Sequence, residues 1–155
     1  MIYFFEGVDE SKKTTMAKTV AQITGIPLWE RAPYLPHHTF KERHEDEGIF
    51  YILDELKTIE LLKKLEVDVI IDRHPLISEI VYSEVHGREQ LLAVPEAYDF
   101  SGEFVFLMLS LDPVYNKYVR VLRDFSIPSH IVQHRDFYSA LVEILRHIPG
   151  GGRSG

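Results

Sequence analysis

A short polar loop between two apolar patterns constrains this chain more than any other feature. The apolar segment 2–5 precedes the loop, and apolar residues recur with a helical period over 16–23. Strand, tight loop and helix form the context in which the pattern G-x-x-x-x-G-K-[ST] binds phosphate. Gly7 fits the first glycine of this pattern, Lys13 the lysine and Thr14 the hydroxyl. The sequence therefore predicts a phosphate-binding loop near its N-terminus.

The residue types in this loop match the chemistry of anion binding. Successive loop amides turn inward around an anion, and the following helix adds the positive end of its dipole. We expect Lys13 to bridge the terminal phosphates of a nucleotide and the Thr14 hydroxyl to hold Mg²⁺. A plain strand–helix turn is the alternative. The candidate nucleotide-binding residues are Gly7, Val8, Asp9, Glu10, Ser11, Lys12, Lys13, Thr14 and Thr15.

Lys12 departs from the pattern because it occupies the place of the second glycine. A Cβ there crowds the approach of phosphate, and glycine reaches backbone angles that lysine resists. Lys12 is therefore expected to weaken nucleotide binding. Its positive charge offsets part of that loss but does not relieve a steric clash.

A second polar pair follows a second apolar run. Residues 67–71 are mostly β-branched and predict a buried parallel strand, and Asp72 and Arg73 come directly after it. In open parallel sheets, ligands bind beyond the carboxyl ends of the strands. The acid is suited to hold Mg²⁺ through water, and the arginine to clamp a phosphate. A solvated ion pair at a strand end is the alternative.

These segments together resemble thymidylate kinases and related nucleoside and nucleoside monophosphate kinases, small phage-type members most of all. Residues 5–9 read F-E-G-V-D and 11–15 read S-K-K-T-T, while 69–74 read V-I-I-D-R-H with Ser78 and Tyr82 following. The resemblance covers roughly residues 1–145. It implies a P-loop NTPase fold like that of nucleoside monophosphate kinases. It also implies ATP and Mg²⁺ as cofactors, and phosphoryl transfer to a deoxynucleoside or its monophosphate.

The resemblance also implies roles for residues elsewhere in the chain. In nucleoside kinases an acid near Glu30 acts as base on the sugar hydroxyl, and in monophosphate kinases an arginine near Arg31 binds the acceptor phosphate. Both residues are present, so the acceptor stays open. Arg120 and Arg123 share a helix face, as do lid arginines that neutralise the transferred group. The candidate catalytic residues are Lys13, Arg73, Asp72, Glu30, Arg120 and Arg123; those for substrate are Glu6, Asp9, Arg31, Phe40, Tyr51, Arg73 and Tyr82; those for metal are Thr14 and Asp72.

Several candidates have structural alternatives. Helical aromatics such as Phe50 and Tyr51 are more often core residues. His130 and His134 lie four apart, but no third ligand is placed by the sequence, which disfavours a structural metal.

Composition narrows the class of protein and its partners. The net charge of −7, from 24 acids and 17 bases, disfavours nucleic-acid binding. The chain contains no cysteine, and no apolar stretch approaches the ~18 residues of a membrane span. We expect a cytoplasmic protein (host cytoplasm if phage-encoded) that acts on small molecules, with a homodimer as one assembly. Two other functions stay open: a degenerate P-loop protein impaired by Lys12, and a kinase acting on a modified base in DNA.

Alternating strands and helices predict a three-layer α/β fold in which helices flank a parallel sheet. One domain over 1–148 and a flexible Gly-rich tail over 149–155 are expected. The predicted strands are 2–6, 28–29, 67–71 and 104–109; the predicted helices are 13–24, 48–65, 76–86, 113–122 and 131–147, with irregular chain at 30–47, a loop at 124–130 and a continued or separate short helix at 88–93.

Overall fold

A parallel sheet forms the centre of the computed structural model, which describes residues 1–8, 11–29, 45–87, 89–90 and 98–150. Within these residues the sheet has five strands in the order β2-β3-β1-β4-β5. Their bounds are β1 (Ile2–Glu6), β2 (Leu28–Trp29), β3 (Val69–Asp72), β4 (Glu103–Leu107) and β5 (Ser129–Ile131). Phe5 lies between Asp72 of β3 and Phe106 of β4, so the carboxyl ends of the three central strands meet at one edge.

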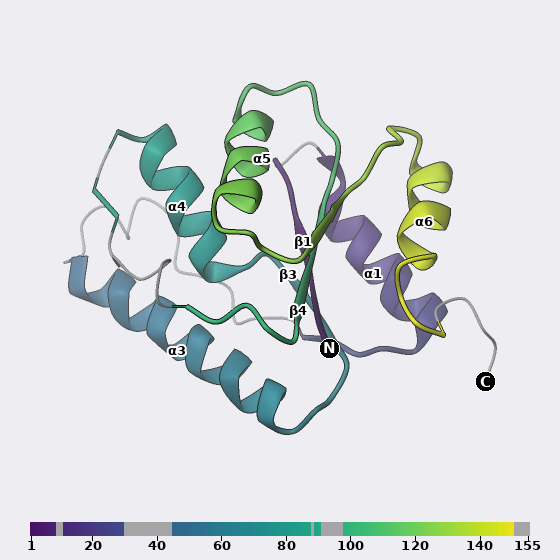
Figure 1. Cartoon of the computed structure of the whole chain (residues 1–155), viewed down its shortest axis with the longest axis horizontal. Coiled ribbons are helices and arrows are strands. Elements are labelled where there is room, and N and C mark those ends of the chain that lie inside the picture. Colours follow the sequence, from purple (N-terminus) through teal and green to yellow (C-terminus); the bar gives the residue numbers. More distant parts are fainter. Residues whose placement is uncertain (9–10, 30–44, 88, 91–97, 151–155) are drawn as a thin grey trace.

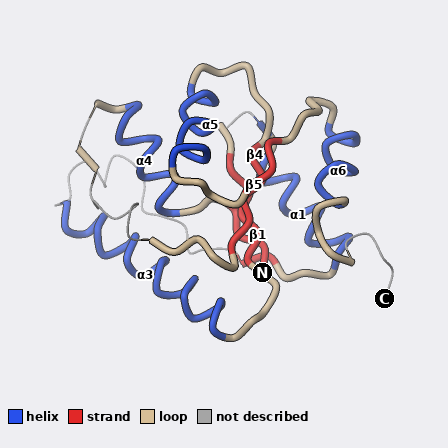
Figure 2. Tube along the Cα trace, viewed as in Figure 1, coloured by secondary structure: helices blue, strands red, loops and turns tan. Residues whose placement is uncertain are grey.

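Helices cover both faces of the sheet (Figure 1). They are α1 (Lys13–Thr24), α3 (Glu45–Lys64), α4 (Pro75–Val85), α5 (Val114–Asp124) and α6 (Phe137–Leu145). Figure 2 shows the strands between α3, α4 and α5 on one side and α1 and α6 on the other. In the described part of the chain, no helix is both long and apolar enough to cross a membrane.

The central strand β1 is buried on both faces, as its unbroken apolar sequence predicts. Alternate side chains enter two separate cores because successive residues of a strand point to opposite faces. Phe4 packs in the core beneath α3, α4 and α5, whereas Phe5 packs with residues of α1 and α6. The loop after β1 therefore starts from a fixed position.

Most predicted elements are confirmed, with shifted bounds. The helix predicted at 48–65 begins at Glu45, so residues 45–47 are helical rather than irregular. The strand predicted at 67–71 runs from Val69 to Asp72. Residues 89–90 lie outside any helix, while 30–44, 88 and 91–93 are outside the described residues.

The prediction for the C-terminal third was wrong in two respects. Residues 129–131 form β5, although 129–130 were predicted as loop and 131 as the start of a helix, and the last helix starts at Phe137 rather than near 131. The three-residue sequence Ser-His-Ile carries little strand signal by itself. It becomes a strand because β4 pairs with it, with Phe106 opposite His130. The Asp136 carboxylate then accepts a hydrogen bond from the Ser139 amide at 2.9 Å and caps α6.

Candidate active site

The site begins where β1, β3 and β4 end side by side. The Arg73 amide donates to the Phe5 carbonyl at 2.9 Å, and the Met108 amide donates to the Glu6 carbonyl at 2.9 Å. These bonds extend the sheet past its last paired residues. They bring the loop after β1 next to the turn after β3, although the two are far apart in sequence.

Gly7 opens the loop because a side chain has no room there. Its φ is +152°, and an added Cβ would lie 2.6 Å from Ser11 Oγ and 3.2 Å from Met108 Cβ. Ser11 closes the turn, since its hydroxyl donates to the Val8 carbonyl at 2.6 Å and its amide donates to the same carbonyl at 2.9 Å. The first glycine of the pattern is thus required by packing.

Lys12 adopts the backbone conformation that the missing glycine would favour. Its φ of 62° and ψ of 26° are left-handed, and it occupies the N-cap position of α1. A non-glycine residue in this region costs roughly 1–2 kcal/mol. The Lys12 side chain is exposed. The Lys12 carbonyl accepts from the Met16 amide at 2.9 Å, which is the first hydrogen bond of the helix. The amides of residues 13–15 come before this bond and are of the kind that a helix N-terminus offers to an anion.

Lys13, Thr14 and Asp72 form the polar centre of the site. Thr14 Oγ1 donates to Asp72 Oδ2 at 2.6 Å, and Lys13 Nζ lies 3.7 Å from Asp72 Oδ1. The Lys13 side chain is only 8% exposed, whereas that of Asp72 is 29% exposed. The loop and the strand end thus present a buried ammonium, a hydroxyl and a carboxylate together.

Arg73 directly follows Asp72 and contacts α4 through Tyr82. Its φ is 79°, which is also left-handed, and its guanidinium carbon lies 5.8 Å from the centre of the Tyr82 ring. Tyr82 itself meets the buried Tyr118 edge-on, at a ring-centre distance of 6.3 Å. Arg73 is therefore directed along α4, and the predicted substrate residues Arg73 and Tyr82 lie together.

Glu6 is fully buried at the end of β1. Its carboxylate accepts a hydrogen bond from Ser78 Oγ at 3.1 Å. Burial raises the pKa of Glu6 to about 7, even though Arg73 and Lys13 favour the ionised form. Ser78 stands in the D-R-H-x-x-x-S segment but was not among the predicted site residues. Its place in the segment that carries the kinase resemblance is the signal that could have identified it.

The two arginines of α5 have carboxylate partners on the helices. Arg120 pairs with Glu84 of α4, and Arg123 Nε lies 3.6 Å from Asp124. The lid role predicted for them stays a prediction.

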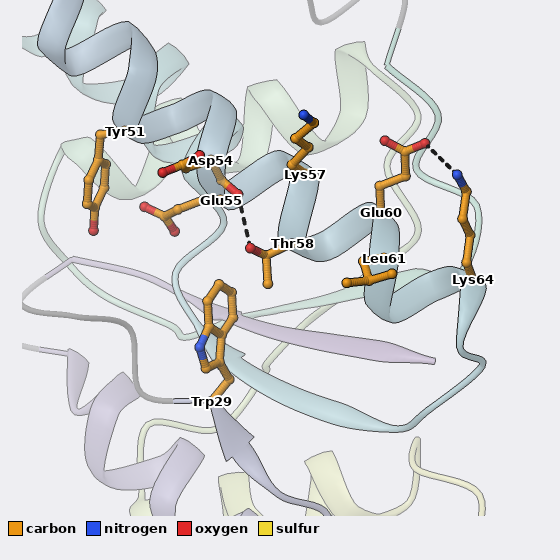
Figure 3. A pocket seen from close by; sticks show the side chains of 9 residues that line it. All are labelled: Trp29, Tyr51, Asp54, Glu55, Lys57, Thr58, Glu60, Leu61 and Lys64. Atoms are coloured by element: carbon orange, nitrogen blue, oxygen red, sulfur yellow. Dashed lines mark hydrogen bonds and ion pairs between the residues drawn. The ribbon is translucent and has the colours of Figure 1, made fainter.

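Tyr51 lines a pocket of about 790 Å³ between α3 and the edge strand β2 (Figure 3). Phe50, its neighbour, is 68% exposed, so the core alternative was wrong for Phe50. The pocket is lined by Trp29, Tyr51, Asp54, Glu55, Lys57, Thr58, Glu60, Leu61 and Lys64.

Five predicted site residues, Asp9, Glu10, Glu30, Arg31 and Phe40, lie outside the described residues. His130 and His134 both bond to Glu143 instead of forming a metal site. Among the described residues, no three His, Cys, Asp or Glu side chains are grouped so that they could hold a metal ion.

The strand order, the loop at the end of β1 and the Asp-Arg pair at the end of β3 give a fold like that of nucleoside and nucleotide kinases. Solved structures share it over nearly the whole chain. Thymidylate kinase from Ehrlichia chaffeensis matches with a TM-score of 0.62 and 21% identity, covering 95% of this chain and 97% of the other. Deoxyadenosine kinase from M. mycoides with bound dATP matches with a TM-score of 0.63 and 14% identity, covering 95% of this chain and 98% of the other.

The YorR protein of Bacillus subtilis in complex with phosphorylated GDP matches with a TM-score of 0.63 and 16% identity, covering 100% of this chain and 99% of the other. No protein-family model and no curated protein matches the sequence. At these identities the structural matches establish the fold.

Proposed function

We propose that this protein transfers the γ-phosphoryl group of ATP to a deoxynucleoside or a deoxynucleoside monophosphate. One observation carries the proposal: Lys13, Thr14 and Asp72 converge at the carboxyl edge of the sheet. This is where ligands bind in open parallel sheets. The structural matches support the same class of reaction, because they include a thymidylate kinase and a deoxyadenosine kinase.

The loop supplies the donor half of the reaction. Lys13 carries its charge to the terminal phosphates, and the first-turn amides of α1 bind phosphate oxygens. An oxygen of the acceptor forms a bond to the γ-phosphorus, the bond to the β–γ bridging oxygen breaks, and ADP leaves with the electron pair. The protein contributes position and charge neutralisation, which dominate phosphoryl transfer.

Arg73 supplies the acceptor half. Its guanidinium lies over Tyr82, beside the buried Glu6, and it is suited to clamp an acceptor phosphate or the transferring group. A nucleoside acceptor must also lose a hydroxyl proton, and Glu30 is the proposed base. A monophosphate acceptor attacks through an ionised phosphate oxygen, which Arg31 is proposed to bind.

The residues at the centre of the site fit Mg²⁺. Thr14 Oγ1 and Asp72 Oδ2 are 2.6 Å apart, so a hydroxyl and a partly exposed carboxylate already lie side by side. Magnesium in nucleotide sites uses one or two such oxygens together with substrate phosphates. When bound, the ion would neutralise negative charge on the phosphates.

A homodimer through α3 is proposed as the assembly. Phe50, Leu53 and Leu61 are exposed on this helix, and Leu65 is exposed directly after it. Asp54, Lys57, Glu60 and Lys64 are also exposed there, and in an antiparallel pair of α3 helices their acids and bases face one another. Sedimentation analysis tests this: Leu61→Glu should give monomers, and a monomeric unaltered protein contradicts it. The absence of cysteine fits a cytoplasmic location.

A nucleotide panel scored for ADP release with ATP and Mg²⁺ tests the proposed activity. The panel holds deoxynucleosides, their monophosphates and low-salt duplex DNA, and Lys13→Ala is the control. Release with a deoxynucleoside or monophosphate, abolished by Lys13→Ala, supports the proposal. Release only with DNA favours a kinase for modified bases. If the protein neither releases ADP nor binds ATP, the result favours a degenerate P-loop protein.

A further inference from the structure

His74, the residue after Arg73, is completely buried although it is polar. It lies against Phe4, with ring centres 4.4 Å apart, and against Phe100 at 5.6 Å. The His74 side chain also caps α4, because the Leu76 amide donates to Nδ1 at 3.1 Å. An amide can only donate, so Nδ1 must accept, and the ring hydrogen is assigned to Nε2.

His74 Nε2 therefore donates to Glu103 Oε1, at 2.5 Å. Glu103 is the first residue of β4 and is itself buried. Its other oxygen accepts from Tyr98 Oη at 2.7 Å and pairs with Lys63 of α3. Burial alone would raise the pKa of Glu103, but the bonds from His74, Lys63 and Tyr98 outweigh it and lower the pKa.

These contacts tie three elements to the turn that carries Arg73. Lys63 Nζ also donates to the Asp99 carbonyl at 2.8 Å, which fixes the segment before β4. Arg73 has a left-handed φ of 79°. A strained backbone of this kind persists only where its surroundings over-determine it. The Arg73 amide is held by Phe5 on one side, and the following residue is held by Glu103 on the other.

We infer that the buried His74–Glu103 pair positions Arg73 by locking the strained turn after β3. His74 and Glu103 are positioning residues, since they act through Arg73 and not on substrate. The inference rests on the proposed function only where it links this turn to acceptor use.

Two substitutions of His74 separate positioning from helix capping. His74→Asn keeps an acceptor near the place of Nδ1 and can cap α4, but it does not reach Glu103. His74→Gln places an amide near Nε2 and keeps a donor for Glu103, but it loses the cap. Positioning predicts damage in the asparagine variant and rescue in the glutamine variant. A purely capping role predicts the reverse.

Amide hydrogen exchange measures the turn directly and needs no activity. The Val105 amide, which donates to the Pro128 carbonyl at 2.9 Å, is the internal reference for global stability. In His74→Asn, exchange at Arg73 relative to Val105 should rise about tenfold or more, because the bond to Phe5 opens locally. In His74→Gln the ratio should stay close to that of the unaltered protein.

Acceptor kinetics form the second arm. His74→Asn should lower kcat/KM for the acceptor about ten- to a hundredfold while KM for ATP stays unchanged, since misplacement of one group carries costs of this size. Glu143→Gln, which alters a histidine-bound carboxylate on the other face of the sheet, is the control and should change neither readout.

Lys63→Met is a further variant in case His74→Asn does not fold. It removes a donor to Glu103 near the surface and should raise the exchange ratio at Arg73 in the same direction. An unchanged ratio in His74→Asn or Lys63→Met, or equal effects of asparagine and glutamine, overturns the inference. If the unaltered protein shows no kinase activity but the exchange pattern holds, the proposed function fails and the positioning role stands.

Discussion

Thr14 Oγ1 donates a hydrogen bond of 2.6 Å to Asp72 Oδ2, joining the first turn of α1 to the last residue of β3. The two residues are far apart in sequence, and parallel pairing of β1 with β3 brings them together. A hydroxyl and a carboxylate in this arrangement, beside the buried Lys13, form the part of the site on which the proposed chemistry depends.

Replacing Lys13 should abolish phosphoryl transfer without unfolding the chain. Its ammonium is buried beside Asp72, and it is the lysine of the loop pattern that binds the terminal phosphates of nucleotides. Lys13→Ala should lower kcat by about 10²–10³ or more, the size found for preorganised charge contacts. Steady-state ADP release measures this, and Lys18→Ala on the exposed side of α1 is the matched control. Activity within tenfold of the unaltered protein would show that the loop is assigned wrongly.

Glycine at position 12 should tighten ATP binding. Lys12 holds a left-handed φ of 62°, which glycine adopts without strain, and its Cβ is expected to crowd a bound phosphate. Lys12→Gly should raise ATP affinity at least about tenfold, or about 1.4 kcal/mol. Calorimetric titration with ATP and Mg²⁺ measures it.

Lys12→Ala is the control for that experiment, since it removes the charge but keeps the Cβ. If Lys12→Ala binds ATP more weakly and Lys12→Gly binds it no more tightly, the loop tolerates a side chain at position 12 and the Lys12 charge contributes to ATP binding. No binding by any of the three forms would favour a P-loop fold without its nucleotide function.

Arg73→Ala should damage use of the acceptor more than binding of ATP. The guanidinium lies over Tyr82 of α4, whereas the loop after β1 is proposed to bind ATP. The loss in transition-state stabilisation should be about 2–4 kcal/mol. The measurement is kcat/KM for the acceptor beside the Kd for ATP. An unaltered acceptor kcat/KM would remove Arg73 from the site.

Glu6 should make the protein less stable as the pH rises through neutrality. Burial raises the pKa of Glu6 in the folded state to about 7 from its ordinary value of 4.5, so the folded protein binds this proton more tightly than the unfolded chain. The stabilisation is fully present below pH 4.5 and is lost as pH rises through 7. Its size is about 3 kcal/mol by the usual conversion.

Denaturant unfolding at pH 5 and pH 8 tests this. In Glu6→Gln the difference in unfolding free energy between pH 5 and pH 8 should shrink, because a neutral amide replaces the titrating carboxyl group. Glu60→Gln, at an exposed position of α3, is the matched control and should keep the original difference. An equal difference in Glu6→Gln and the unaltered protein would show that Glu6 does not titrate as described.

Much of the site could be predicted because its signals are local. The loop pattern needs only the spacing of Gly7, Lys13 and Thr14, and an apolar run followed by Asp72 and Arg73 predicts a buried strand with polar residues at its end. Patterns of this kind can be recognised within a short stretch of sequence, because the periods of strands and helices involve residues close together in the chain.

What depends on distant partners was decided by the tertiary structure alone. Ser129–Ile131 became a strand only because β4 offered an open edge, and Glu103 gained a role only because His74 folds against it. The left-handed turn at Arg73 likewise follows from packing on both sides. The sequence by itself determined the class of fold and the loop that is proposed to bind phosphate, because both arise from local patterns. The tertiary structure determined which buried polar residues meet, because residues that come together only in the fold have no characteristic spacing in the sequence.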